Sequence, residues 1–292
     1  MNGKLHIEAF FDLNTSTFSY LVYDNEKLEA VIIDSVLNFD PKSGRTTMDS
    51  ADRILQRAKQ CQLNILWHLE THVHADHLSA AVYLQKQLGG KLAIGSDIVQ
   101  VQQVFGSLFN LGSEFQRDGS QFDCLLQDGD CLAIGQFMLR AMHTPGHTPA
   151  CMTYLIEDRQ CIHAFVGDTL FMPDYGTARC DFPGGSAESL YASIQKVLCL
   201  PDNTKLYMCH DYPPNSRTEQ FLTSVKAQRD DNVHVHAGIT QQAFVSMRKA
   251  RDATLSMPVL LLPAVQVNMR AGHFPPAEDN GVSYLKLPLN QL

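Results

Sequence analysis

The stretch Thr71-His72-Val73-His74-Ala75-Asp76-His77 places three imidazoles and one carboxylate within seven residues, directly after the apolar run 64–69. Neutral imidazole and carboxylate together bind zinc, iron and manganese. Packing of an ordinary core does not require three histidines at this spacing. A histidine-rich surface loop is the alternative interpretation, and it would need no matching residues elsewhere. The rest of the chain supplies such residues, so we expect a metal centre here.

The composition is that of a globular protein. The chain has 292 residues, of which 45% are hydrophobic and 18% charged, enough for one large domain. Its net charge of −8 argues against a nucleic-acid or anionic-membrane surface, because such surfaces need clustered Lys and Arg. The first ten residues do not resemble a signal peptide, and no apolar stretch is long enough to span a bilayer. The eight cysteines form no Cys-x-x-Cys pair. We therefore expect a cytoplasmic protein with reduced thiols and with no nucleic-acid or membrane partner.

Strands are predicted in two batches, each followed by helices. The first batch has strands at 19–23, 29–34, 64–69 and 92–94 and helices at 48–60 and 78–88; the second has strands at 137–142, 151–156, 162–166 and 206–209 and helices at 190–198 and 241–254. This order predicts an α/β fold of four layers, αββα, in which two mixed β-sheets are sandwiched between helices. Residues 1–292 are expected to form a single domain.

The C-terminal part, residues 213–292, is predicted to be a helical and irregular extension that packs on this domain. Within it, the segment Asn268-Met269-Arg270-Ala271-Gly272-His273 has no regular pattern. We expect this segment to lie outside the core and either to fold over the site or to support a homodimer.

Four loops that follow predicted strands carry residues able to bind a metal. They hold His72, His74, Asp76 and His77, then His147, then Asp168, and finally His210. A single histidine after a strand is usually a surface or core residue. The joint pattern is more specific, since loops at one edge of a rigid sheet often form active sites. Asp34 also ends a strand, and we expect it to support His72 or His74, because metal-bound imidazoles usually need a carboxylate or carbonyl partner.

The order and spacing of these motifs resemble the metallo-β-lactamase superfamily over roughly residues 19–212. Its His-x-His-x-Asp-His motif matches residues 72–77, and its later loops match Thr144-Pro145-Gly146-His147-Thr148, Val166-Gly167-Asp168-Thr169 and Cys209-His210-Asp211. The resemblance implies the metallo-β-lactamase fold. In a two-metal member, His72, His74 and His147 would hold one ion, Asp76, His77 and His210 the other, and Asp168 would lie between them.

Within this superfamily, the chain looks most like the persulfide dioxygenases, which are related to the glyoxalase II hydrolases. The likeness rests on Glu70-Thr71-His72-Val73-His74-Ala75-Asp76-His77-Leu78 and on Gly176-Thr177-Ala178-Arg179-Cys180-Asp181-Phe182. It implies one Fe(II) per chain, held by His72, His147 and Asp168, with positions left open for the substrate and O2. His74, Asp76, His77 and His210 would then orient the ligands and solvent. The implied reaction oxidises glutathione persulfide with O2 to sulfite and glutathione.

Glutathione carries two carboxylates, and the fork of an arginine binds a carboxylate through both oxygens. Arg179 is the first candidate for this contact because it lies close to Asp168 in the sequence. Tyr175 could add a hydroxyl group to the pocket, and Arg217 and Arg270 are further candidates. The alternative for Arg179 is an ion pair with Asp181 that holds the loop, and for the other two arginines a solvated position.

Two other functions stay open at this point. The complete set of seven ligands also suits a dinuclear zinc hydrolase of the glyoxalase II, lactonase or β-lactamase type, in which two zinc ions share a hydroxide. A non-catalytic sensor or scaffold could keep the same fold, although such a protein would be free to lose the ligands. The identity and number of the bound metal ions would separate the first two functions.

Overall fold

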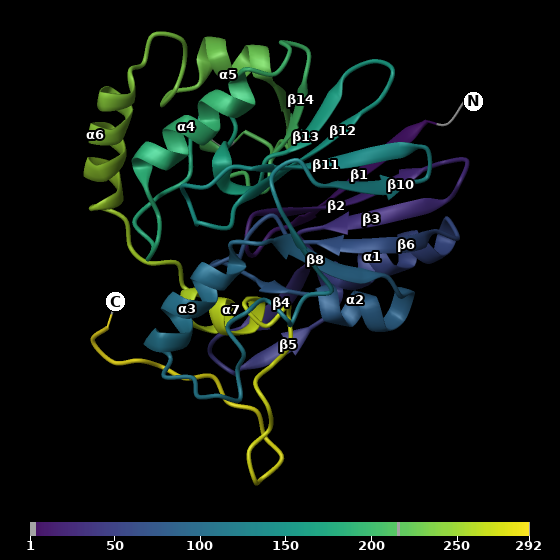
Figure 1. The fold of residues 1–292 in the computed structure, drawn as a ribbon, viewed down its shortest axis with the longest axis vertical. Coiled ribbons are helices and arrows are strands. Elements are labelled where there is room, and N and C mark those ends of the chain that lie inside the picture. Colours follow the sequence, from purple (N-terminus) through teal and green to yellow (C-terminus); the bar gives the residue numbers. More distant parts are fainter. Residues whose placement is uncertain (1–3, 215–216, 292) are drawn as a thin grey trace.

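The structure is a computed structural model that describes residues 4–214 and 217–291. Two large sheets lie face to face in the middle, and helices cover the outer side of each (Figure 1). This arrangement confirms the predicted α/β fold of αββα layers.

The first sheet brings the carboxyl ends of its parallel strands to one edge. Its strands are, in spatial order, β1 (Leu5–Asp12), β2 (Thr17–Asp24), β3 (Glu29–Ile33), β6 (Asn64–Leu69), β8 (Lys91–Gly95) and β9 (Cys124–Leu126). Pairing is antiparallel from β1 to β3 and parallel from β3 to β9. Because β3 and β6 are parallel neighbours, Asp34 and the loop that begins at Glu70 leave the sheet side by side.

The second sheet delivers the other predicted ligands to the same region. Its strands are, in spatial order, β10 (Cys131–Ile134), β11 (Phe137–His143), β12 (Met152–Glu157), β13 (Ile162–Phe165), β14 (Lys205–Tyr207) and β15 (Leu222–Ser224). Only β13 and β14 pair in parallel. His147 lies between β11 and β12, Asp168 lies in a short 3-10 turn just after β13, and His210 follows β14. A small third sheet contains β5 (Arg45–Thr47), β4 (Val36–Asp40) and β7 (Leu78–Ser79).

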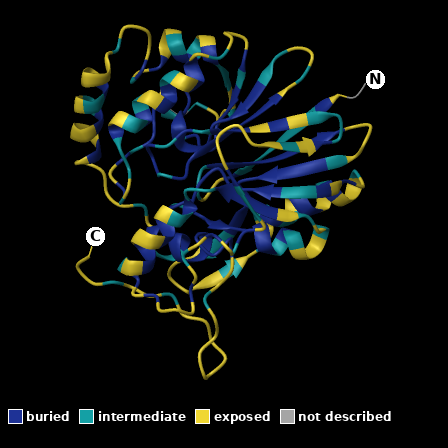
Figure 2. Ribbon diagram, in the orientation of Figure 1, coloured by how far each residue is buried: buried dark blue, intermediate teal, exposed yellow. Residues whose placement is uncertain are grey.

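The strands of both sheets consist largely of buried residues (Figure 2), and apolar side chains from the two sheets form one cluster between them. Tyr20 from the first sheet and Tyr154 and Phe165 from the second are almost fully buried between the sheets. The first sheet packs its outer face on α1 (Asp49–Gln60), α2 (Ala81–Leu88) and α7 (Leu261–Asn268), and the second on α4 (Ala187–Leu198), α5 (Val225–Asp231) and α6 (Gln241–Asp252). The remaining helix, α3 (Ile98–Leu108), packs with α7 beside the histidine loop.

Most of the predicted elements are confirmed, and two differ for clear reasons. The helix predicted over 78–88 begins only at Ala81, because Leu78 and Ser79 pair with β4. The extension 213–292 is not only helical and irregular, since β15 adds a strand to the second sheet. All eight cysteines are free thiols, as expected. Among the described residues, no helix combines the length and the apolar character that crossing a bilayer requires.

The prediction that residues 268–273 lie outside the core was wrong. Helix α7 ends at Asn268, and Met269 and Ala271 are buried in the same apolar cluster as Val73 and Ala75 of the histidine loop. Residues on every side of α7 are buried, so the helix shows no amphipathic period in the sequence. Pro263 lies in its first turn, where proline is tolerated.

We expect Phe165→Ala to lower the free energy of unfolding by about 3–5 kcal/mol, because it opens a cavity between the two sheets. Met138→Ala on β11 is the control, since Met138 is 52% exposed and should change stability by less than about 0.5 kcal/mol. Urea denaturation followed by circular dichroism measures both. Equal losses in the two variants would contradict the packing described here.

Candidate metal centre and substrate pocket

Three ligand atoms from three separate loops converge where β6 and β13 end. His72, His147 and Asp168 each offer one atom, and these atoms lie within 4.8 Å of one another. Oδ2 of Asp168 is 3.6 Å from Nε2 of His147 and 4.0 Å from Nε2 of His72. Direct hydrogen bonds between such atoms are shorter, about 2.7–3.2 Å, so these separations suit atoms that surround one ion.

The other predicted ligands form a second set beside the first. His74, Asp76 and His77 also offer atoms within 4.8 Å of one another. Nε2 of His210 lies 3.2 Å from Oδ2 of Asp76 and 3.4 Å from Oδ1 of Asp168. The two oxygens of Asp168 therefore face different sets, and all seven predicted residues lie together at one edge of the two sheets.

Several buried polar atoms in this region show that a metal fits. Four of them have no hydrogen-bond partner among the described residues: Nδ1 of His74, Nε2 of His77, Nε2 of His210 and Oδ1 of Asp168. A buried acceptor without a partner costs about 1–3 kcal/mol, and native proteins leave few of them. Four such atoms pointing into one region are the arrangement that a bound cation would satisfy.

Each histidine has a partner for its other ring nitrogen. Nδ1 of His147 donates to the Arg179 carbonyl at 2.8 Å, Nδ1 of His77 donates to the Leu78 carbonyl at 3.0 Å, and Nε2 of His74 donates to Asp34 at 3.0 Å. The hydroxyls of Thr71 and Thr17 lie 3.0 and 3.2 Å from Nδ1 of His72 and His210. Such partners fix the orientation of each ring and aim the other nitrogen at the metal. The predicted role of Asp34 is confirmed for His74.

The surroundings of His72 and His77 keep both imidazoles neutral, which leaves a nitrogen lone pair on each ring available to a metal. Burial lowers the pKa of His72 well below its ordinary value and that of His77 to about 4, so both imidazoles are neutral at pH 7. His74 differs: burial lowers its pKa, but the Asp34 and Glu70 carboxylates outweigh this and raise it. The two carboxylates stabilise positive charge on this ring, and a cation at Nδ1 would be stabilised in the same way.

A glycine permits the close approach of two of the loops. Gly167 has a φ of 50°, and a Cβ added to it would lie 2.8 Å from the Thr71 side chain. Any larger residue would push Asp168 away from the histidine loop. This is a local reason why Asp168 follows a glycine.

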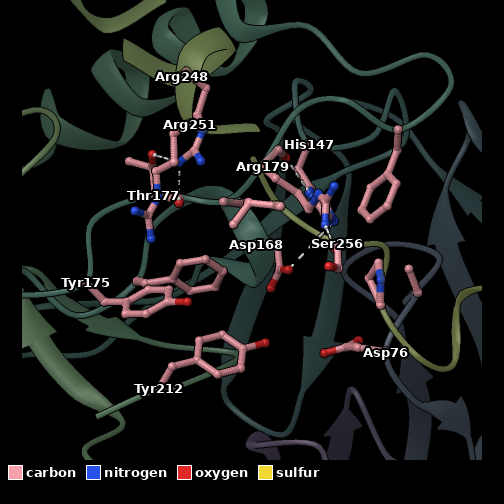
Figure 3. A pocket seen from close by; sticks show the side chains of 16 residues that line it. Asp76, His147, Asp168, Tyr175, Thr177, Arg179, Tyr212, Arg248, Arg251 and Ser256 are labelled. Atoms are coloured by element: carbon pink, nitrogen blue, oxygen red, sulfur yellow. Dashed lines mark hydrogen bonds and ion pairs between the residues drawn. The ribbon is translucent and has the colours of Figure 1, made fainter. Parts of the chain in front are cut away.

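A pocket opens directly onto these ligands (Figure 3). It has a volume of about 220 Å³, and Asp76, His147 and Asp168 are among the residues that line it. Tyr175, Tyr212 and Phe171 form an aromatic wall, with ring centroids of Tyr175 and Tyr212 5.0 Å apart. Figure 3 shows Arg248 and Arg251 on the side of the pocket opposite Tyr212.

A profile of the metallo-beta-lactamase superfamily matches residues 14–210. The chain belongs to the metallo-β-lactamase superfamily. Its sequence is 60% identical to that of a probable metallo-hydrolase of Burkholderia pseudomallei, and the alignment covers 98% of this chain and 99% of that relative. It is 49% identical to glyoxylase B2 of Dictyostelium discoideum, and this alignment covers 100% of this chain and 99% of that relative.

The chain is also similar, at lower identity, to persulfide dioxygenases. It is 31% identical to the mitochondrial persulfide dioxygenase ETHE1 of Bos taurus, covering 91% of this chain and 88% of the other. Among solved structures, ETHE1 from Myxococcus xanthus superposes with a TM-score of 0.73 at 29% identity, covering 92% of this chain and 100% of the other.

The four residues predicted to bind the substrate occupy different environments. Tyr175 and Arg179 line the pocket. The Arg179 guanidinium binds both oxygens of Asp181 at 2.6 Å, which is the alternative foreseen for it, and also donates to the Ser256 carbonyl.

Arg217 and Arg270 lie outside the pocket. Arg217 pairs with Asp174 and Asp211, and Arg270 lies over the ring of Phe115. The guanidinium groups of these two arginines therefore contact other parts of the fold and do not face the metal ligands.

Sequence reasoning missed the contribution of helix α6 to the pocket. Arg248 and Arg251 lie three residues apart and so share one face of the helix. Arg248 is buried, pairs with Asp252 and donates to the Thr177 carbonyl, whereas Arg251 is exposed. The helix was predicted, but nothing in its pattern indicates which face meets the metal loops.

Tyr212 was missed for a similar reason, since it follows the His210 loop in an irregular segment.

Asn268 is a further residue whose contribution to the site the sequence did not reveal. Its Nδ2 donates to the carbonyls of His74 and His77 at 2.9 and 2.8 Å, and its Oδ1 accepts from the Ser79 backbone at 2.8 Å. One buried side chain at the end of α7 thus holds three backbone groups of the histidine loop. The residues it binds are about 190 positions away in the chain.

We expect Asn268→Ala to weaken the binding of Zn²⁺ by the set of His74, Asp76 and His77 about 10- to 100-fold, because the loop that presents His74 and His77 loses its supporting hydrogen bonds. Competition with a metal-binding dye measures the affinity. Gln266→Ala is the matched control on the same helix, since Gln266 binds the Lys286 backbone and not the loop. Unchanged affinity in the folded Asn268→Ala protein would exclude this supporting role.

Proposed function

We propose that this protein is a persulfide dioxygenase that uses a single Fe(II) held by His72, His147 and Asp168. The observation that carries the proposal is that these three side chains form one ligand group and that two of them, His147 and Asp168, line the pocket. His72, His74, His77 and His210 are buried and do not line the pocket, and Asp76 is the one member of the second set that does. A substrate that enters the pocket therefore meets two members of the two-histidine, one-carboxylate group, with Asp76 beside them.

The proposed reaction needs a redox-active ion with adjacent open positions. Fe(II) in a two-histidine, one-carboxylate site supplies both, whereas zinc has no accessible redox change. In the overall reaction, glutathione persulfide, O2 and water give glutathione, sulfite and two protons. The outer sulfur is oxidised and O2 is reduced.

The chain's own residues would bind and orient the glutathione part. Among the described residues that line the pocket, Arg179 and Arg248 are paired with Asp181 and Asp252, and Arg251 is the cation for which the structure shows no ion pair. We propose Arg251 as the partner of a glutathione carboxylate, because its fork is free to bind both oxygens. Tyr175 and Tyr212 would exclude water from the persulfide end, and Arg179 would hold the loop that supports His147.

The likeness to persulfide dioxygenases at 31% identity and to the Myxococcus structure at a TM-score of 0.73 supports this proposal. A second candidate function is a dinuclear zinc hydrolase of glutathione thioesters or lactones. One support for it is the second ligand set, in which His74, Asp76 and His77 offer ligand atoms close to one another. Another is that two relatives of higher identity are named as a probable metallo-hydrolase and a glyoxylase. Two zinc ions sharing a hydroxide could attack a thioester carbonyl.

Protein purified without air separates the two functions. We expect about one iron per chain and O2 uptake with glutathione persulfide. Asp168→Ala should abolish both, since it removes the anionic ligand, whereas His77→Ala should keep its iron and most of the O2 uptake. Elemental analysis and an oxygen electrode measure the two quantities. Iron-loaded, folded protein that consumes no O2, or equal iron loss in both variants, would refute the mononuclear dioxygenase.

We expect Arg251→Gln to raise KM for glutathione persulfide about tenfold with little change in kcat, because a charged contact to a distant carboxylate is lost equally in the ground state and the transition state. Lys249→Gln on the same helix is the matched control, since Lys249 pairs with Glu188 and does not line the pocket. A KM that stays at the wild-type value in Arg251→Gln would remove this residue from the substrate contact.

A further inference from the structure

A separate group of ligand side chains lies at the turn of the hairpin formed by β12 and β13. Asp158, Cys161 and His163 each offer one atom, and the three atoms lie within 4.8 Å of one another. We propose that these three residues form a zinc-binding site that is distinct from the active-site metal centre. Carboxylate oxygen, thiolate sulfur and imidazole nitrogen are all ligands that Zn²⁺ takes in proteins. The site does not depend on the proposed oxidation of persulfide.

The distances match the edges of a tetrahedral zinc site. Sγ of Cys161 is 3.7 Å from Nε2 of His163, and Oδ2 of Asp158 is 3.1 Å from the same nitrogen. Ligand atoms bound to zinc at 2.0–2.3 Å with tetrahedral angles lie about 3.3–3.6 Å apart. These two separations differ from such edges by only a few tenths of an ångström, and the 3.1 Å contact is a hydrogen bond that a bound ion would replace. Asp158 and Cys161 are only partly buried, so water could supply the fourth ligand.

The turn holds these ligands in place before any ion binds. Oδ1 of Asp158 accepts from the backbone of Gln160 at 2.7 Å and of Cys161 at 2.9 Å, which leaves Oδ2 directed at His163. On the other side of the ring, Nδ1 of His163 lies 3.0 Å from the hydroxyl of Tyr207 on β14. A metal-bound histidine usually has such a partner on its second nitrogen, because it fixes the tautomer and the ring plane.

The position of the site links it to the active centre through the hairpin. His147 precedes β12, Asp168 follows β13, and the proposed ligands lie at the opposite end of the same two strands. Since a strand rises about 3.3 Å per residue, β13 separates the two sites by only about 13 Å. A zinc ion at the turn would hold together the two strands that carry both pocket-facing ligands. It would also add one zinc to the metal content of a chain whose active site holds only iron.

The test uses the iron-loaded protein and Co²⁺ as a spectroscopic probe for zinc. Wild type should take up one further equivalent of Co²⁺ with a thiolate-to-cobalt absorption band in the near ultraviolet, and excess Zn²⁺ should remove the band. Cys161→Ser should lose the band and the extra equivalent, while its iron content and O2 uptake stay at the wild-type level. Asp158→Asn keeps the acceptor that holds the turn and should bind the probe at least tenfold more weakly.

Cys131→Ser is the matched control, because Cys131 is exposed and belongs to none of the ligand groups among the described residues. It should bind Co²⁺ like wild type. Wild-type protein that takes up no cation beyond its iron, or a Cys161→Ser variant that keeps the band, would overturn the proposal. Because these measurements are made on metal content and absorption, failure of the dioxygenase activity alone would leave the result intact.

Discussion

A buried imidazole nitrogen or carboxylate oxygen that has no partner destabilises a fold unless a cation binds it. This protein buries several such atoms at one edge of its two facing sheets. His74, His77 and His210 are completely buried, each with one ring nitrogen that lacks a hydrogen-bond partner in the described part of the chain. These three nitrogens belong to the second ligand set, so the structure requires that this set be held where a cation can bind it. Free energy from metal binding and from folding would be shared in this region.

The protein meets this requirement with ordinary hydrogen bonds from distant segments. Asp34 at the end of β3 binds the Thr71 backbone at 2.7 Å and the ring of His74 at 3.0 Å. Asn268 at the end of α7 binds the same loop from the other side. Both side chains are buried, so their hydrogen bonds do not compete with water. The histidine loop is thus clamped between an early strand and a late helix.

The same geometry explains why two functions compete for this site. The second ligand set is complete, but its histidines are buried and only its Asp76 lines the pocket, whereas His147 and Asp168 of the first set both do. Coordination chemistry accordingly permits two ions, and the pocket exposes more of the first ligand set than of the second. Helix α6 adds Arg251 at the rim, which suits an anionic substrate in a protein whose net charge is −8.

Local sequence was sufficient to predict the candidate ligands that the structure brings together, and most strands, because both depend on short-range order. Residues 72–77 supply four of the seven candidate ligands within one loop, and alternating or continuous apolar runs reveal strands such as β6 and β13 without any tertiary information. Helix α7 could not be recognised in this way, since a helix buried on all sides has no amphipathic period. The positions of Asn268 against the histidine loop and of Arg251 in the pocket lining were equally inaccessible. Each depends on which element packs beside the histidine loop, and that is settled only when segments far apart in the chain bury their surfaces against one another.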